Sequence, residues 1–96
     1  MGFLYDRLDM SGRVAVVTGS GQNLGRGMAI GLAEVGASVV IAEIDEKTGP
    51  AMERELIADG HEALWVHTNV RDAASVDMMV STTIDRFGSL DVMVSN

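Results

Sequence analysis

With 96 residues the chain suits one domain, residues 1–96, and its 47% apolar and 22% charged residues are typical of a globular protein. A formal net charge of -7 argues against nucleic acid and acidic membranes as partners, because both carry negative charge themselves. Cysteine is absent, which excludes disulfides and thiol chemistry, and without a secretory pattern or an apolar run of about 20 residues we expect a cytoplasmic protein.

Short β-branched runs alternate with longer helical patterns, which is the rhythm of β–α–β units. Val14–Thr18 is nearly continuous in apolar residues, as expected of a central parallel strand that is buried on both faces. The next segment predicts a helix from Leu24 to Val35, ended by Gly36. Spacings of four, four and three give this helix one apolar face, made of Leu24, Met28, Leu32 and Val35.

The middle of the chain predicts a second strand and a second helix. The strand is expected over Ser38–Ala42, where β-branched and other apolar residues follow one another. Asp45 or Thr48 can then cap a helix that runs through Asp59, because both residue types accept hydrogen bonds from the first helical turn.

A third strand, a third helix and a fourth strand follow. The strands are expected over Ala63–Val66 and Leu90–Val94. Between them Asp72 can cap the third helix, and Gly88 can close it. Right-handed crossovers then favour a parallel sheet in the order 3-2-1-4, with the first two helices on one face and the third on the other. The predicted fold class is therefore α/β, half of a doubly wound sheet.

Several side chains are expected to be structural. Core positions in helices and strands are predicted for Met52, Met78, Met79 and Met93. A solvated helix face is predicted for Glu53, Glu55 and Asp59. His61 and His67 lie apart from any carboxylate pattern, so no metal site is expected.

A glycine-rich turn, residues 18–25, opens directly onto the first predicted helix. Small residues let the backbone approach a diphosphate, and the unpaired N–H groups of the first helical turn face the anion. Glycine spacing alone fits a plain tight turn equally well. The preceding buried strand and the following amphipathic helix favour the diphosphate interpretation.

Glu43 stands eighteen residues after Gly25, at the end of the second predicted strand. A carboxylate there can accept hydrogen bonds from the adenosine ribose hydroxyls. It would oppose a 2'-phosphate, since like charges ~4 Å apart repel by about 4 kcal/mol before screening. No Arg or Lys lies between Val39 and Glu46 to accept a further phosphate, so NAD is predicted in preference to NADP. The alternative is a solvated strand end.

Three motifs together resemble the short-chain dehydrogenase/reductase family. Thr18-Gly19 with Gly25 is similar to its Thr-Gly-x-x-x-Gly-x-Gly fingerprint, with Asn23 at the middle glycine, and asparagine tolerates a left-handed backbone best among the other residues. Asn69-Val70 resembles the family's Asp-Val, which meets the adenine. Residues 91–96 resemble the fourth strand running into Asn-Asn-Ala-Gly, with Ser95 at the first Asn.

The resemblance covers about residues 8–96 and implies a Rossmann-like sheet, truncated after the fourth strand. It implies hydride transfer between a nicotinamide and an alcohol or carbonyl in a full-length parent, where a small-molecule substrate would bind. The family's Tyr-x-x-x-Lys pair has no counterpart here, because the only tyrosine is Tyr5 and the only lysine is Lys47. No catalytic residue is therefore assigned, and the 96 residues are expected to be inactive. Cofactor binding is assigned to Gly19, Gln22, Asn23, Leu24, Gly25, Glu43, Ile44, Asn69, Val70 and Asn96.

Two other interpretations stay open at this point. A non-catalytic nucleotide-binding or interaction module would bind AMP or NAD without turnover. A methyltransferase also places glycines after its first strand, although Thr18-Gly19 and residues 94–96 fit a dehydrogenase better. Because the sheet is expected to stop after its fourth strand, Val92 and Val94 are expected along an open apolar edge. This edge predicts aggregation, self-association as a homo-oligomer such as a dimer, or poor folding.

Overall fold

Strands and helices alternate along the chain in the computed structural model, which describes residues 9–19 and 23–95. The described elements are β1 (Val14–Thr18), α2 (Asn23–Glu34), β2 (Ser38–Glu43), α3 (Thr48–Ala58), β3 (Ala63–His67), α4 (Ala73–Phe87) and β4 (Val92–Val94). They match the predicted elements closely, although β4 begins at Val92 rather than Leu90. Among the described helices, none is both long and apolar enough to cross a membrane.

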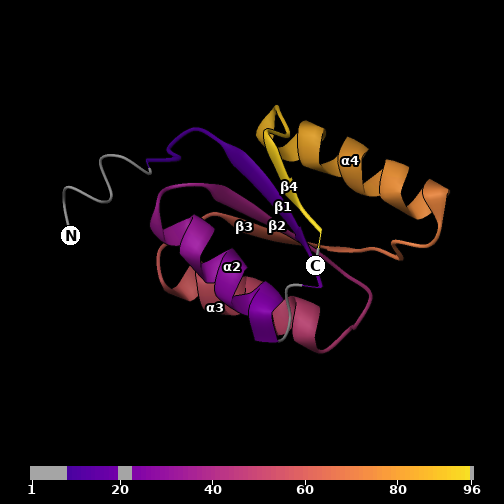
Figure 1. Ribbon diagram of the computed structural model, residues 1–96, viewed down its shortest axis with the longest axis horizontal. Coiled ribbons are helices and arrows are strands. Elements are labelled where there is room, and N and C mark those ends of the chain that lie inside the picture. The colour runs from indigo at the N-terminus through magenta and orange to yellow at the C-terminus, as the bar shows by residue number, and fades with distance from the viewer. Residues whose placement is uncertain (1–8, 20–22, 96) are drawn as a thin grey trace.

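The described strands form one parallel sheet in the order β3-β2-β1-β4, as predicted (Figure 1). All five residues of β1 are buried, because strands flank it on both sides and helices cover both faces. A parallel strand in this position must be apolar along its whole length, which explains the continuous run of β-branched residues. Since the strands are parallel, all their carboxyl ends open at the same edge of the sheet.

Helices α2 and α3 cover one face of the sheet and α4 covers the other (Figure 1), and an apolar cluster lies on each face. On one face, α2 and α3 pack through Ala29, Ala33, Met52 and Leu56. On the other face, α4 packs through Met79 against Val14, Val16, Val40 and Ala42. The predicted distribution of helices, two on one face and one on the other, is therefore correct.

The apolar face predicted for α2 is only partly buried: Leu32 packs against the core, but the most deeply buried side chains of the helix are alanines. Ala29 and Ala33 are completely or almost completely buried against the sheet. By contrast, Leu24 is 68% exposed and Met28 is 37% exposed. Small side chains let the helix approach the sheet closely. The positions of the large side chains therefore did not indicate which face of α2 packs against the sheet. Met28, Leu32 and Val35 line an apolar groove, together with Met10 and Val94.

The helix ends follow the predicted capping chemistry in part. Asp72 Oδ1 accepts a hydrogen bond from the Ala74 N–H at 3.0 Å and caps α4 as predicted. Gly88 closes α4 with a φ of 88°, a left-handed conformation that glycine adopts without strain. Asp45 acts just before α3, where its Oδ1 accepts from the backbone N–H groups of Lys47 and Thr48.

Some of the structural assignments made from the sequence are wrong. Met52 and Met79 are buried, but Met78 is 67% exposed and Met93 is 47% exposed. Of the three acidic residues predicted to form a solvated helix face, Asp59 follows α3 and is exposed, whereas Glu53 and Glu55 have partners. Glu55 forms an ion pair with Arg26 of α2, and Glu53 accepts a 2.7 Å hydrogen bond from the Trp65 N–H of β3.

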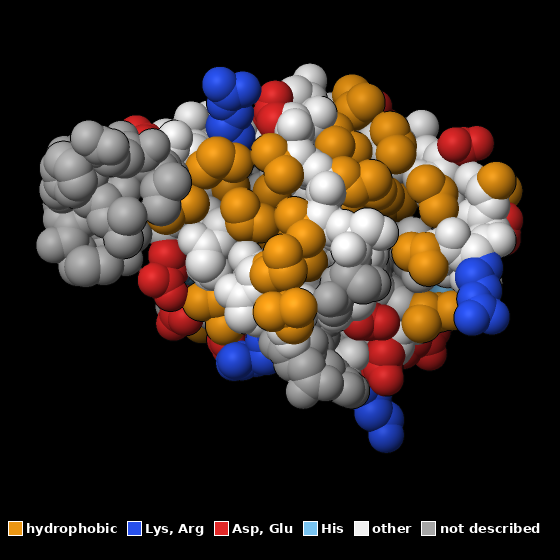
Figure 2. All heavy atoms as spheres, in the orientation of Figure 1, with side chains coloured by type: hydrophobic (Ala, Val, Ile, Leu, Met, Phe, Trp, Pro, Cys, Tyr) orange, Lys and Arg blue, Asp and Glu red, His pale blue; other side chains and the backbone are white. Residues whose placement is uncertain are grey.

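β4 lies at one edge of the described sheet and carries unpaired backbone groups. The Asp91 N–H donates to the Val14 carbonyl, and alternation along a parallel ladder then turns Met93 toward β1 as well. The N–H groups of Val92 and Val94 consequently face away from β1. Apolar side chains gather on the same surface, between α2 and α4 (Figure 2). An exposed edge of this kind is a template for another strand.

We propose that a second copy of the chain pairs with this edge, as the open-edge expectation implies. Met93→Lys places a charge on the edge strand and should shift the 96-residue chain toward a mass of 10.2 kDa in sedimentation velocity. Met78→Lys is the matched control, because Met78 is exposed on α4, away from the edge. A monomeric wild-type chain, or equal effects of the two substitutions, would contradict the proposal.

Asp91, which directly precedes β4, binds the first residue of β1. Its Oδ2 accepts hydrogen bonds from the Val14 N–H at 2.8 Å and from the Ser89 hydroxyl at 3.0 Å. Its other oxygen lies 4.0 Å from the Arg13 guanidinium. The hydrogen bond from Val14 is the main cause that lowers the Asp91 pKa below its ordinary value of 3.8, followed by the bond from Ser89. The folded state thus favours the ionised carboxylate.

A pKa that is lower in the folded state makes Asp91 stabilising above its unfolded pKa, and this stabilisation is lost as the pH falls through the folded pKa. Asp91→Asn should therefore lower the unfolding midpoint in urea at pH 7. The difference from wild type should shrink as the pH falls below about 4. A difference that is constant from pH 7 to pH 3 would show that the charge of Asp91 has no part in holding β4.

Candidate functional site

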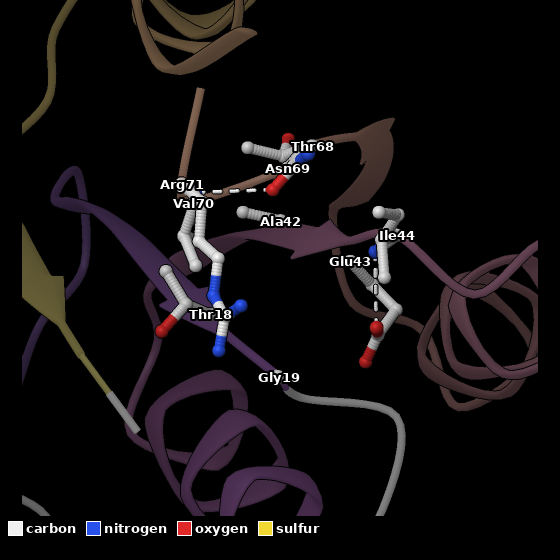
Figure 3. A pocket seen from close by; sticks show the side chains of 9 residues that line it. All are labelled: Thr18, Gly19, Ala42, Glu43, Ile44, Thr68, Asn69, Val70 and Arg71. Carbon is white, nitrogen blue, oxygen red and sulfur yellow. Dashed lines mark hydrogen bonds between the residues drawn. The ribbon is translucent and has the colours of Figure 1, made fainter. Parts of the chain in front are cut away.

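A pocket of about 450 Å³ opens at the carboxyl ends of β1, β2 and β3 (Figure 3). This is the edge of a parallel sheet at which ligands bind in folds of this class. The described residues that line the pocket come from three strand ends and the segments that follow them: Thr18, Gly19, Ala42, Glu43, Ile44, Thr68, Asn69, Val70 and Arg71. Five of the predicted cofactor-binding residues are thus brought together.

The glycine-rich turn begins where β1 ends, and Gly19 continues the pairing of β1 with β2. Its N–H donates to the Ala42 carbonyl at 3.2 Å. Its φ of 62° is left-handed, so a residue with a Cβ atom would be strained there. The Thr18 hydroxyl donates to the Val94 carbonyl at 3.4 Å, which joins the start of the turn to β4. The sheet therefore fixes the entry to the turn.

Glu43 lies at the end of β2 with its carboxylate held by the backbone that follows. Its Oε2 accepts from the Ile44 N–H at 3.0 Å and from the Asp45 N–H at 3.2 Å. The Thr68 N–H donates to its carbonyl oxygen at 3.1 Å. These contacts come from two neighbouring segments, so both the main chain and the carboxylate of Glu43 have defined positions.

The Trp65 indole completes this support from the α3 side of the sheet. Its Nε1–H donates to the Glu43 carbonyl at 3.0 Å. The ring lies so close to Gly49 of α3 that a Cβ atom at this position would come within 2.8 Å of the indole. Glycine is required at position 49 because the tryptophan needs that space.

Two apolar side chains, Ile44 and Val70, line the pocket from the ends of β2 and β3. Ile44 is 51% exposed and Val70 is 60% exposed. Exposed branched side chains on opposite segments of one pocket provide surfaces for the faces of a planar, largely apolar group such as a purine ring. Both residues therefore line the pocket, and their contact with a cofactor stays a prediction.

Asn69 is more constrained than the sequence suggests. Its Oδ1 accepts from the Arg71 N–H at 3.0 Å, and its carbonyl accepts from the Asp72 N–H. Its own N–H donates to the Ser75 hydroxyl at 2.9 Å. The amide therefore shapes the turn between β3 and α4. A second lone pair on Oδ1 still leaves one hydrogen-bond acceptor for a ligand.

Sequence reasoning missed Arg71, whose side chain lines the pocket (Figure 3). The sequence predicted no cation at this site, because no Arg or Lys lies between Val39 and Glu46, where a partner for a phosphate was expected. Topology gives the missing signal. The chain leaves β3 and must cross over β2 and β1 to reach β4 through α4, so the residues after Val70 face the same pocket.

The other predicted cofactor-binding residues have different positions. Gln22 and Asn96 lie outside the described residues. Asn23 begins α2, next to Leu24, which is exposed, and Gly25, which is buried. Neither Leu24 nor Gly25 is among the described residues that line the pocket. Within the described ranges, no group of three His, Asp or Glu side chains could hold a metal ion.

Comparison with known proteins agrees with this architecture. The family model described as short chain dehydrogenase matches residues 13–96. An uncharacterized oxidoreductase of Thermotoga maritima is 46% identical over 87 residues, which are 91% of this chain and 34% of that protein.

Two solved structures are similar over most of the chain. A hydroxysteroid dehydrogenase from Escherichia coli has a TM-score of 0.91 at 27% identity, over 95% of this chain and 39% of the other. A short chain dehydrogenase/reductase from Burkholderia phymatum in complex with NAD has a TM-score of 0.86 at 32% identity. The match covers 88% of this chain and 30% of the other.

The sheet order, the glycine-rich turn and the family match define an oxidoreductase-type dinucleotide-binding fold. The chain belongs to the short-chain dehydrogenase/reductase family. It spans about a third of the length of the curated relatives that it matches.

The contact between Gly49 and Trp65 can be tested by adding one methyl group. Gly49→Ala forces the indole away from α3 and should lower the free energy of unfolding by about 1–3 kcal/mol. The matched control is Gly27→Ala in α2, where a Cβ atom meets nothing within 4 Å. The control should raise the free energy of unfolding by about 0.5–1 kcal/mol. Urea denaturation measures both, and two changes of the same sign would contradict the contact.

Proposed function

We propose that this chain is the NAD-binding, N-terminal part of a short-chain dehydrogenase/reductase, and that it binds the adenosine half of the cofactor in the pocket beside Glu43. The observation that carries the proposal is the Glu43 carboxylate, held by the Ile44 and Asp45 N–H groups at the rim of a pocket with apolar walls. A carboxylate in this position can accept hydrogen bonds from both hydroxyls of the adenosine ribose. The NAD complex of the Burkholderia phymatum relative supports the choice of cofactor class.

The preference for NAD over NADP rests on the negative charge of Glu43. A 2'-phosphate on the adenosine ribose would replace a hydroxyl that donates to this carboxylate. The dianionic phosphate would lie next to it and be repelled. The carboxylate is already oriented by its two backbone donors, so moving it away from the phosphate would break these hydrogen bonds.

In the full-length parent, we propose hydride transfer between the nicotinamide and an alcohol or carbonyl of a small-molecule substrate. The 96 residues should bind NAD without turnover, because Tyr5 and Lys47 are not spaced as the catalytic Tyr-x-x-x-Lys pair. Binding without turnover by a full-length protein would instead favour a non-catalytic nucleotide-binding module. The cytoplasmic location stays a prediction.

Glu43→Gln tests the proposed role of the carboxylate. Loss of the charged acceptor should weaken NAD binding by roughly tenfold and narrow the preference for NAD over NADP, because a charge-assisted hydrogen bond is lost and a repulsion is removed. Trp65 is the only tryptophan and donates to the Glu43 carbonyl, so its fluorescence can report binding in titrations with both dinucleotides.

The matched control is Glu46→Gln, which removes the same charge from an exposed residue of the loop between β2 and α3. It should leave both affinities near those of the wild-type chain. Equal affinity of the wild-type chain for NAD and NADP, or equal effects of the two substitutions, would refute the role assigned to Glu43.

A further inference from the structure

Arg71 occupies a position that the proposed contacts with adenosine do not use. It follows Val70 in the segment that crosses from β3 toward α4, and it lines the pocket from the side opposite Ile44. Figure 3 shows its side chain extending toward the end of β1, with the guanidinium between Thr18 and Glu43 in this view. The cation therefore reaches toward Gly19, where the glycine-rich turn begins.

The backbone of Arg71 is held by a hydrogen bond, while its guanidinium remains available to bind a ligand. The Arg71 N–H is bound to Asn69 Oδ1, and Asn69 itself is bound to Ser75 and Asp72. Among the described residues, the guanidinium has no hydrogen-bond or ion-pair partner. It is also the only basic side chain among the described residues that line this pocket, in a chain with a net charge of -7.

We infer that Arg71 recognises the phosphate attached to the 5'-oxygen of the bound adenosine, an inference that rests on the proposed nucleotide site. The guanidinium is a planar, permanently charged donor that matches the geometry of phosphate oxygens. Its side chain points toward the β1 end of the pocket, while Glu43 lies at the end of β2. A ribose held by Glu43 would place the 5'-phosphate on the side of Gly19 and Arg71.

The position of Glu43 decides between the two phosphates that an adenosine nucleotide can carry. A 2'-phosphate would lie against the carboxylate, whereas a 5'-phosphate extends away from it along the pocket. The structure therefore assigns the cation to the 5'-phosphate, which NAD and NADP share. Arg71 should consequently increase affinity for both dinucleotides and have little effect on the choice between them.

Calorimetric titrations of the 96-residue chain with adenosine, 5'-AMP and 2'-AMP test this assignment. Arg71→Gln should weaken 5'-AMP binding by roughly tenfold, because it removes a charge-assisted contact. Adenosine binding should be unchanged, and Arg71→Lys should restore part of the affinity for 5'-AMP. The matched control, Arg54→Gln, removes the same charge from an exposed residue of α3 and should leave all three affinities unchanged.

The possible outcomes separate this inference from the proposed function. A wild-type chain that binds neither adenosine nor 5'-AMP overturns the nucleotide site, and the role of Arg71 with it. Normal adenosine binding together with equal effects of Arg71→Gln and Arg54→Gln overturns the role of Arg71 alone. A loss confined to 2'-AMP assigns the guanidinium to the other phosphate and overturns the inference as stated.

Discussion

The parallel pairing of β1 with β2 is the constraint on which the site depends. Val14–Thr18 pairs residue by residue with residues 38–42, and the Gly19 N–H extends the ladder beyond the end of β1 to Ala42. This last hydrogen bond places the start of the glycine-rich turn beside Glu43. A change of register by one residue would turn every side chain of the strand to the opposite face and separate the two. The geometry of the pocket is therefore a property of the sheet.

The strand order, the side of the sheet that each helix covers and half of the pocket could be predicted from the sequence, because each rests on a local pattern. The unbroken apolar run of β1 indicated a central strand, and Glu43 and Ile44 were found by their place at the end of β2. Asp72 and Gly88 marked the ends of α4 through capping chemistry, which involves only neighbouring residues.

The errors concern interactions between distant segments. The buried face of α2 was missed because Ala29 and Ala33 contribute contact through close approach, which the size of a side chain does not indicate. Glu53 was predicted to be a solvated acid, yet it also accepts a hydrogen bond from a backbone N–H of β3. Arg71 could be found only from the crossover that carries it over the strand ends.

Glu53 has a consequence for how copies of this sheet can meet. Its carboxylate accepts the Trp65 N–H, which faces outward because alternate residues of β3 pair with β2. Glu53 of α3 thus blocks the middle of the β3 edge of the sheet, while no described side chain binds an outward N–H of β4. If two copies pair through their β4 strands, neither copy has another open sheet edge left for pairing. Assembly would then stop at a closed pair with twofold symmetry and could not propagate into a fibre.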